Sequence, residues 1–126
     1  YYIIFKYSII NKYDNILILQ DDFEMQKELK NKIHIQRISD FIKNDRNWDI
    51  YSFGTLIRES SITSYNHHVR LLEGIGSHAL IFSKNIIKKY VEDYDDTEQD
   101  NINWDFDNNF NKYNTYNYYI HFNQIR

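Results

Sequence analysis

The sequence contains no cysteine and no proline, and only three of its 126 residues are glycine. Without cysteine, the chain can form neither a disulfide framework nor a cysteine-ligated zinc site. It also lacks an excess of basic charge, because 15 basic and 18 acidic side chains give a formal charge of −3. Nucleic-acid binding through phosphate neutralisation needs a concentrated basic face, so the composition disfavours that class of function.

Long apolar runs and targeting signals are also missing. No run of about 18 apolar residues occurs, so we expect no transmembrane helix. The apolar start, from Tyr1 to Phe5, has no basic region or small-residue cleavage site and predicts a fragment rather than a signal peptide. Without a glycosylation sequon we expect a cytoplasmic protein. Ile, Asn, Lys and Tyr are abundant, and their codons are AT-rich. This bias is typical of a genome such as that of a large DNA virus, and the protein would then be located in the host cytoplasm or the virion.

The length and composition suit one domain covering residues 1–126. A hydrophobic content of 42% can fill a modest core, and 26% charged residues is ordinary for a globular protein. Neither an internal repeat nor a Gly/Ser linker divides the chain. Segments that alternate between strand-like and helix-like patterns predict an α/β domain.

Helices are expected where apolar residues recur at helical spacing. Such segments include Ile3 to Ile10, one or two helices within 24–44, Lys84 to about Tyr90 with Ser83 as N-cap, and a last helix near 105–112. Short apolar runs predict strands at Ile16–Leu19, Trp48–Phe53, Val69–Leu72, Ala79–Phe82 and 117–122. Ile16–Leu19 has the pattern of a buried strand in a covered, parallel sheet. Residues 55–68 and 92–101 are expected to be loops.

The most informative polar segment is Gln20-Asp21-Asp22, directly after the first expected strand. In open α/β sheets, ligands bind beyond the carboxyl ends of strands. Adjacent carboxylates there are hard oxygen ligands, suited to Mg²⁺ or Mn²⁺ on a diphosphate. The alternative is a pair of solvated turn residues that cap the next helix.

Two further segments are candidates for a site. Gly74-Ile75-Gly76-Ser77-His78-Ala79 superficially matches a dinucleotide-binding fingerprint, but a strand follows it where the fingerprint needs a helix. The alternative interpretation of this segment is a turn whose backbone can approach a ligand closely. In the segment Trp104–Phe110, Asp105 and Asp107 are each either a general base or a helix N-cap.

The histidines give weaker indications. His67 and His68 lie in a polar segment and are expected at the surface, with their rings pointing in different directions. His34 is expected on the surface of a helix. His121, in the last expected strand, is either a half-buried packing residue or a ligand.

Taken in order, four blocks resemble glycosyltransferase family 25, which includes lipooligosaccharide and procollagen galactosyltransferases. ILILQDDF at Ile16–Phe23 resembles the family's apolar strand followed by Glu-Asp-Asp, and NWDIYSFG at Asn47–Gly54 resembles its Trp-Asp strand ending in Gly. GSHALIFS at Gly76–Ser83 and DNNF at Asp107–Phe110 are similar to its Gly-small-His-Ala block and its Asp-x-x-Leu/Phe block. The four blocks occur in the family's order and spacing, distributed over nearly the whole chain.

The resemblance implies a GT-A-type fold, Rossmann-like and mostly parallel, and metal-assisted, inverting transfer of galactose or glucose from a UDP-sugar. The acceptor would be a hydroxyl of a glycan or of a hydroxylated side chain. Asp22 and Asp21 would hold Mn²⁺ or Mg²⁺ on the donor diphosphate, with His121 as a further ligand. Asp107, or Asp105, would be the base, and Gly76 and His78 would line the pocket.

The chain also departs from the family. Gln20 stands where the family usually has Glu, and the family's first strand has no counterpart here. We therefore expect an exposed sheet edge that an upstream segment or a second copy of the chain covers. The alternative function is a catalytically inactive GT-A-like domain kept for glycan binding or assembly.

Overall fold

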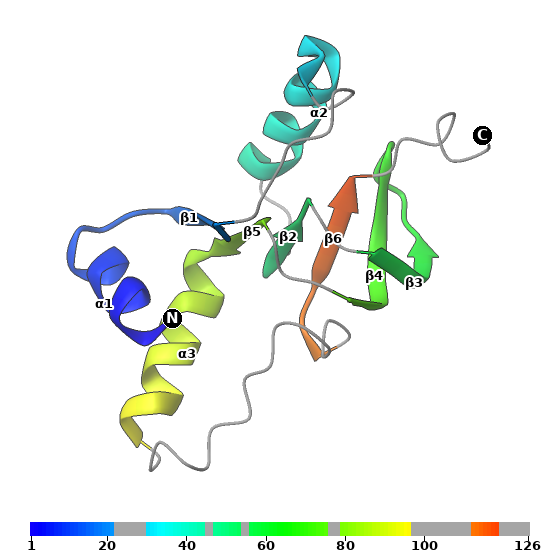
Figure 1. The fold of residues 1–126 in the computed structure, drawn as a ribbon. Helices are drawn as coiled ribbons and strands as arrows, with labels where there is room; N and C mark the ends of the chain where they lie inside the picture. The colour runs from blue at the N-terminus through cyan, green and yellow to red at the C-terminus, as the bar shows by residue number, and fades with distance from the viewer. Residues whose placement is uncertain (22–29, 45–46, 54–55, 76–78, 97–111, 119–126) are drawn as a thin grey trace.

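The fold was analysed in a computed structural model that describes residues 1–126 except 22–29, 45–46, 54–55, 76–78, 97–111 and 119–126. The described part is an α/β structure with a six-stranded mixed sheet and three helices (Figure 1). The elements in chain order are α1 (Tyr2–Ile10), β1 (Asn15–Leu19), α2 (Lys32–Lys43), β2 (Ile50–Ser52), β3 (Leu56–Ile62), β4 (His68–Ile75), β5 (Ala79–Ser83), α3 (Lys84–Asp96) and β6 (Thr115–Tyr118).

The sheet is mostly antiparallel, so the expectation of a mostly parallel sheet was wrong. Its strand order is β1-β5-β2-β6-β4-β3, and only β2 and β6 pair in parallel. Parallel pairing needs long crossover connections, whereas antiparallel pairing tolerates short ones. β2, β3, β4 and β5 follow one another with no helix among the described residues between them. A parallel sheet requires strands and helices to alternate along the chain, and this alternation is absent from the described residues between β2 and β5.

β1 forms where expected, but it is not a buried strand. It lies at one end of the strand order and pairs antiparallel with β5. Ile16 and Ile18 pack against the core, whereas Leu17 and Leu19 are 51% and 50% exposed. An apolar run with polar ends does not distinguish a strand covered on both faces from an edge strand covered on one.

β3 (Leu56–Ile62) occupies half of the segment 55–68 that was expected to be a loop. It pairs antiparallel with β4, with register shifts on either side of Glu59. Residues 59–62 are exposed, and Ile62 is 94% exposed. This edge strand is held by its pairing with β4 and not by burial of its side chains. Its sequence therefore lacks the alternating apolar pattern that predicts a strand.

The two faces of the sheet pack against different helices. α1 and α3 lie together, and α2 lies apart from them (Figure 1). Because side chains alternate across a strand, Ile50 joins the core with Phe5 and Phe82, while its neighbour Tyr51 joins the core with Phe41 of α2.

α1 forms as its spacing predicts and is anchored by Phe5, which is fully buried. The ring of Phe5 packs edge-on against Phe82 and Tyr90, at centroid distances of 5.0 and 5.1 Å. The remaining surface of the helix is apolar but open, and its exposed residues include Ile3, Ile4, Tyr7 and Ile10. None of the described helices is long and apolar enough to cross a membrane.

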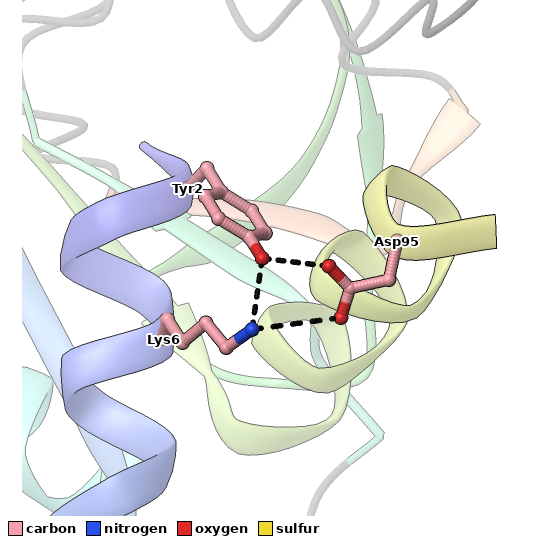
Figure 2. A network of polar contacts seen from close by, with 3 residues as sticks. All are labelled: Tyr2, Lys6 and Asp95. Atoms are coloured by element: carbon pink, nitrogen blue, oxygen red, sulfur yellow. Dashed lines mark hydrogen bonds and ion pairs between the residues drawn. The ribbon is translucent and has the colours of Figure 1, made fainter. Parts of the chain in front are cut away.

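A polar network also ties α1 to α3 (Figure 2). The Tyr2 hydroxyl donates to Oδ1 of Asp95 at 2.6 Å, and Lys6 donates to the Tyr2 hydroxyl at 2.9 Å. The Lys6 ammonium lies 3.9 Å from Oδ2 of Asp95. The hydrogen bond to Tyr2, and then the charge of Asp95, raise the pKa of Lys6. The network is exposed to water, so it orients the two helices more than it stabilises them.

α3 begins where the sequence predicts. The Ser83 hydroxyl accepts a hydrogen bond of 3.3 Å from the backbone N–H of Ile86, which confirms the N-cap. The helix continues to Asp96 instead of ending near Tyr90, because Val91 and Tyr94 extend its contact with the core. It therefore takes up half of the segment 92–101 that was expected to be a loop.

Candidate functional site

One edge of the sheet gathers the ends of several strands. β1 and β2 both pair antiparallel with β5, so they point the same way, and β6 runs parallel to β2. The carboxyl ends of β1, β2 and β6 therefore share an edge with the amino end of β5. Chain segments that leave or enter these strands lie where ligands usually bind in open α/β sheets.

At this edge three separate sequence blocks meet. Leu19, the last residue of β1, is the register partner of Ala79, the first residue of β5. The backbone N–H of Phe53, just after β2, donates a 3.0 Å hydrogen bond to the carbonyl of Ala79. The strands of three sequence blocks, β1, β2 and β5, are thus adjacent in the fold, although they are far apart in the chain.

Of the expected site residues, the described part of the structure contains Asp21. It lies in a turn just beyond β1 and is exposed, next to the exposed Gln20. The other expected site residues lie outside the described residues: Asp22, Gly76, His78, Asp105, Asp107 and His121. Among the residues that are described, no three His, Asp or Glu side chains are grouped to hold a metal ion. Just beyond β1, Asp21 supplies a carboxylate and Gln20 an amide oxygen, both hard ligands of the kind that Mg²⁺ and Mn²⁺ accept.

Asp49 of the Trp-Asp block has a structural part in this arrangement. Its backbone N–H donates to the carbonyl of Asn114 at 2.8 Å, and its Oδ2 accepts from the Asn114 N–H at 2.9 Å. The Asp49 carbonyl also accepts a 2.9 Å hydrogen bond from Ser83 N–H. Asp49 therefore holds the starts of β2 and β6 and the end of β5 together, at the edge opposite the block ends.

Near the end of β6, buried histidine and tyrosine side chains form a cluster that the sequence analysis missed. Nδ1 of His34 lies 2.5 Å from the hydroxyl of Tyr118, and both side chains are buried. The expectation that His34 lies on a helix surface was therefore wrong. His68 is also buried, at the start of β4, whereas His67 is exposed. The expected surface position holds for His67 only.

The surroundings of His68 define the tautomer of its neutral ring. Its Nδ1 lies 2.8 Å from the carbonyl oxygen of Asn66, which only accepts, so Nδ1 carries the proton. In the neutral ring Nε2 is then an acceptor, and the hydroxyl of Tyr51 donates to it at 2.8 Å. Burial, and then Tyr118, raise the pKa of Tyr51 well above its usual value, so this hydroxyl keeps its proton. The ring of Phe41 stacks on His68 at 4.3 Å.

Part of this cluster had a signal in the sequence. His34, Ile38 and Phe41 follow one another at spacings of one helical turn and are the buried residues of α2. The same spacing rule that assigned the apolar face therefore also places His34 on it. His68 and Tyr118 had no such signal, because they meet only through the pairing of β4 with β6.

Comparison of the chain with protein-family models, curated proteins and solved structures finds no match.

Proposed function

We propose that this protein is a hexosyltransferase that resembles glycosyltransferase family 25 and moves galactose or glucose from a UDP-sugar to a hydroxyl of a glycan or a hydroxylated side chain. The observation that carries the proposal is the meeting of three blocks at one sheet edge, through the Leu19–Ala79 pair and the Phe53–Ala79 hydrogen bond. Neighbouring strands of any sheet share their ends, so the meeting supports the proposal because the three strands that meet are those of the blocks that resemble the family.

In this proposal the donor diphosphate lies beyond the end of β1. Asp21 and Asp22 would hold Mn²⁺ or Mg²⁺ there, with His121 as a further ligand. The oxygen ligands that the structure describes here, the Asp21 carboxylate and the Gln20 amide oxygen, fit such an ion in chemical type and in exposure. When bound, the metal would neutralise the charge that builds up on the departing nucleoside diphosphate.

The remaining parts of the reaction come from the resemblance. For transfer with inversion, a base must take the proton of the acceptor hydroxyl, and Asp107 is the first candidate with Asp105 as the second. Gly76 and His78 would line the pocket, and they directly precede Ala79 in the chain. The backbone of Ala79 would then connect the pocket segment to the strand that carries Asp21.

A catalytically inactive domain that binds glycans is the second candidate. One observation favours it, which is Gln20 at the position of the family's usual Glu. That replacement removes one negative charge and so weakens the attraction for a divalent cation. The two candidates differ in metal-dependent nucleotide binding, which the first requires and the second does not.

Calorimetric titration of the chain with UDP, with and without Mn²⁺, tests the proposal. We expect binding that requires Mn²⁺, and substitution of Asp21→Asn or Asp22→Asn should weaken it at least tenfold. Asp14→Asn is the matched control, since Asp14 is exposed just before the amino end of the same strand. It should leave UDP binding unchanged.

Three results would overturn the donor site: no UDP binding in either condition, binding indifferent to metal, or equal losses in Asp14→Asn and Asp21→Asn. Glycan binding without UDP binding would instead support the inactive domain. A panel of UDP-sugars, with release of UDP as the readout, then identifies the donor.

We also propose that an upstream segment or a second copy of the chain covers β1. Its outer edge has no paired strand among the described residues, and Leu17 and Leu19 are half exposed beside it. The strand also carries no charge or proline that would prevent another strand from pairing with it.

A further inference from the structure

Tyr118, the last residue of β6, is surrounded by groups that carry or can acquire positive charge. Its hydroxyl lies 2.5 Å from Nδ1 of His34, and Nη1 of Arg37 donates a long hydrogen bond of 3.5 Å to it. The ring of His67 lies 6.5 Å from the ring of Tyr118. Residues of α2 and of the loop before β4 therefore lie around the same tyrosine side chain.

Within the described part of the chain, Arg37 has no carboxylate partner. The ion pair found there joins Lys6 to Asp95. Asp40, one turn further along α2, is the carboxylate best placed for pairing by sequence. Its Oδ1 instead accepts a 2.7 Å hydrogen bond from Gln36. Arg37 is half-buried. The bond to Tyr118 uses one of the five N–H donors of its guanidinium, and the other four take no part in that bond.

The backbone holds His67 in this position. Its φ of 64° lies in the left-handed region, which non-glycine residues rarely adopt. Such conformations persist where the surrounding structure imposes them, and they are concentrated at ligand sites. Partial burial, and then the charges of Arg37 and His34, lower the pKa of His67. The ring therefore lies in a positive potential that a bound anion would relieve.

We propose that Arg37, His67 and the His34–Tyr118 pair form a binding site for one oxyanion, the phosphate or carboxylate of a ligand. The guanidinium supplies a planar fork that matches two oxygens of such a group. His67 supplies a second donor and becomes cationic more readily once the anion is bound. The Tyr118 hydroxyl is a further hydrogen-bonding group beside Arg37 and His34.

This site is separate from the proposed donor site. β6 is the third strand from β1 in the sheet order, so the two strands lie about 14 Å apart at the usual spacing of about 4.8 Å. Asp21 follows β1, whereas Arg37 lies on α2 and contacts the end of β6. The proposed anion site therefore does not depend on whether the protein transfers a sugar.

Proton NMR of the histidine rings tests the proposal directly. The protein is titrated with inorganic phosphate and, separately, with acetate, at constant pH and at an ionic strength fixed with sodium chloride. We expect a saturable shift of the His67 resonances and a rise in the His67 pKa of at least half a unit at saturation. A response to phosphate alone identifies a phosphate site, and a response to both identifies a general oxyanion site.

Variants link the response to the cluster. Arg37→Gln should abolish the shift, and Arg37→Lys should weaken binding about tenfold, because it keeps the charge but loses the fork. Lys43→Gln is the matched control, since Lys43 is exposed in the last turn of the same helix. It removes one positive charge and should leave the titration unchanged.

The proposal is overturned if no saturable shift occurs, or if Arg37→Gln and Lys43→Gln respond alike. Thermal unfolding of each variant shows whether it is folded. If Arg37→Gln does not fold, His67→Asn replaces it, because asparagine tolerates the left-handed backbone. Phosphate-dependent thermal stabilisation should then fall in His67→Asn, and equal stabilisation of this variant and the wild type would contradict the site.

Discussion

The hydroxyl of Tyr51 donates a hydrogen bond to Nε2 of His68 in the interior between the sheet and α2. The carbonyl of Asn66 holds the other ring nitrogen, so each polar atom of this buried histidine has a partner. The pair joins β2 to β4, which are separated in the sheet by β6. A polar pair in an aromatic core fixes which tyrosine faces which histidine, whereas apolar packing alone would tolerate shifts.

Removing the Tyr51 hydroxyl should destabilise the protein. Tyr51→Phe leaves Nε2 of His68 buried without a donor, which costs about 1–3 kcal/mol in the free energy of unfolding. Urea unfolding measures the loss. Tyr13→Phe is the control, because Tyr13 is exposed, and it should change the free energy of unfolding by less than about 0.5 kcal/mol. Equal values for the two variants would contradict the assigned hydrogen bond.

Phe5 should be the residue that attaches α1 to the rest of the molecule. Phe5→Ala removes a fully buried ring that touches Phe82 and Tyr90, and should cost about 3–5 kcal/mol. Ile3→Ala, on the same helix at 81% exposure, should change the free energy of unfolding by less than about 0.5 kcal/mol. Thermal and urea unfolding check both values. A small effect of Phe5→Ala would mean that α1 does not pack as described.

His67 should make the protein less stable in mild acid. Its pKa in the fold lies below the usual 6.5, because of partial burial and then the charges of Arg37 and His34. The unfolded chain therefore binds the proton more readily, and the free energy of unfolding falls as the pH is lowered through about 6.5. His67→Asn should flatten this part of the profile.

The same shift is measurable at the residue itself. The NMR titration midpoint of His67 should lie below 6.5 in the wild type and should rise in Arg37→Gln. Lys43→Gln should leave the midpoint in place. A wild-type midpoint at or above 6.5 in phosphate-free buffer would contradict the positive surroundings of this ring.

The open edge of β1 should make the isolated chain associate. Leu17→Lys places a charge in the middle of this exposed apolar edge, which is how natural edge strands avoid pairing. We expect sedimentation to show concentration-dependent association of the wild type and a larger monomer fraction in the variant. Lys12→Glu, in the turn before β1, is a control for general charge effects. A wild type that stays monomeric would contradict the expectation.

Periodicity and local chemistry were sufficient for most single elements. The spacing of Ile3 to Ile10 predicts α1, and the Ser83 hydroxyl predicts where α3 begins. Apolar runs likewise predicted β1 and β5 to within one residue. These features depend on residues within one or two turns or strands of each other, so the sequence contains the information they need. β3 was not predicted, because its exposed residues Ser60 and Ser61 show no alternation of apolar and polar side chains.

The amino-acid sequence alone therefore predicts the local elements, the lack of cysteine chemistry and the polar segment that follows β1. The strand directions, the edge position of β1 and the burial of His34 and His68 depend on the tertiary structure. It also decided that Leu19 and Phe53 both meet Ala79. The reason is that strand pairing depends on the relative free energies of contacts between distant segments, and no local pattern of residues specifies which two edges will meet.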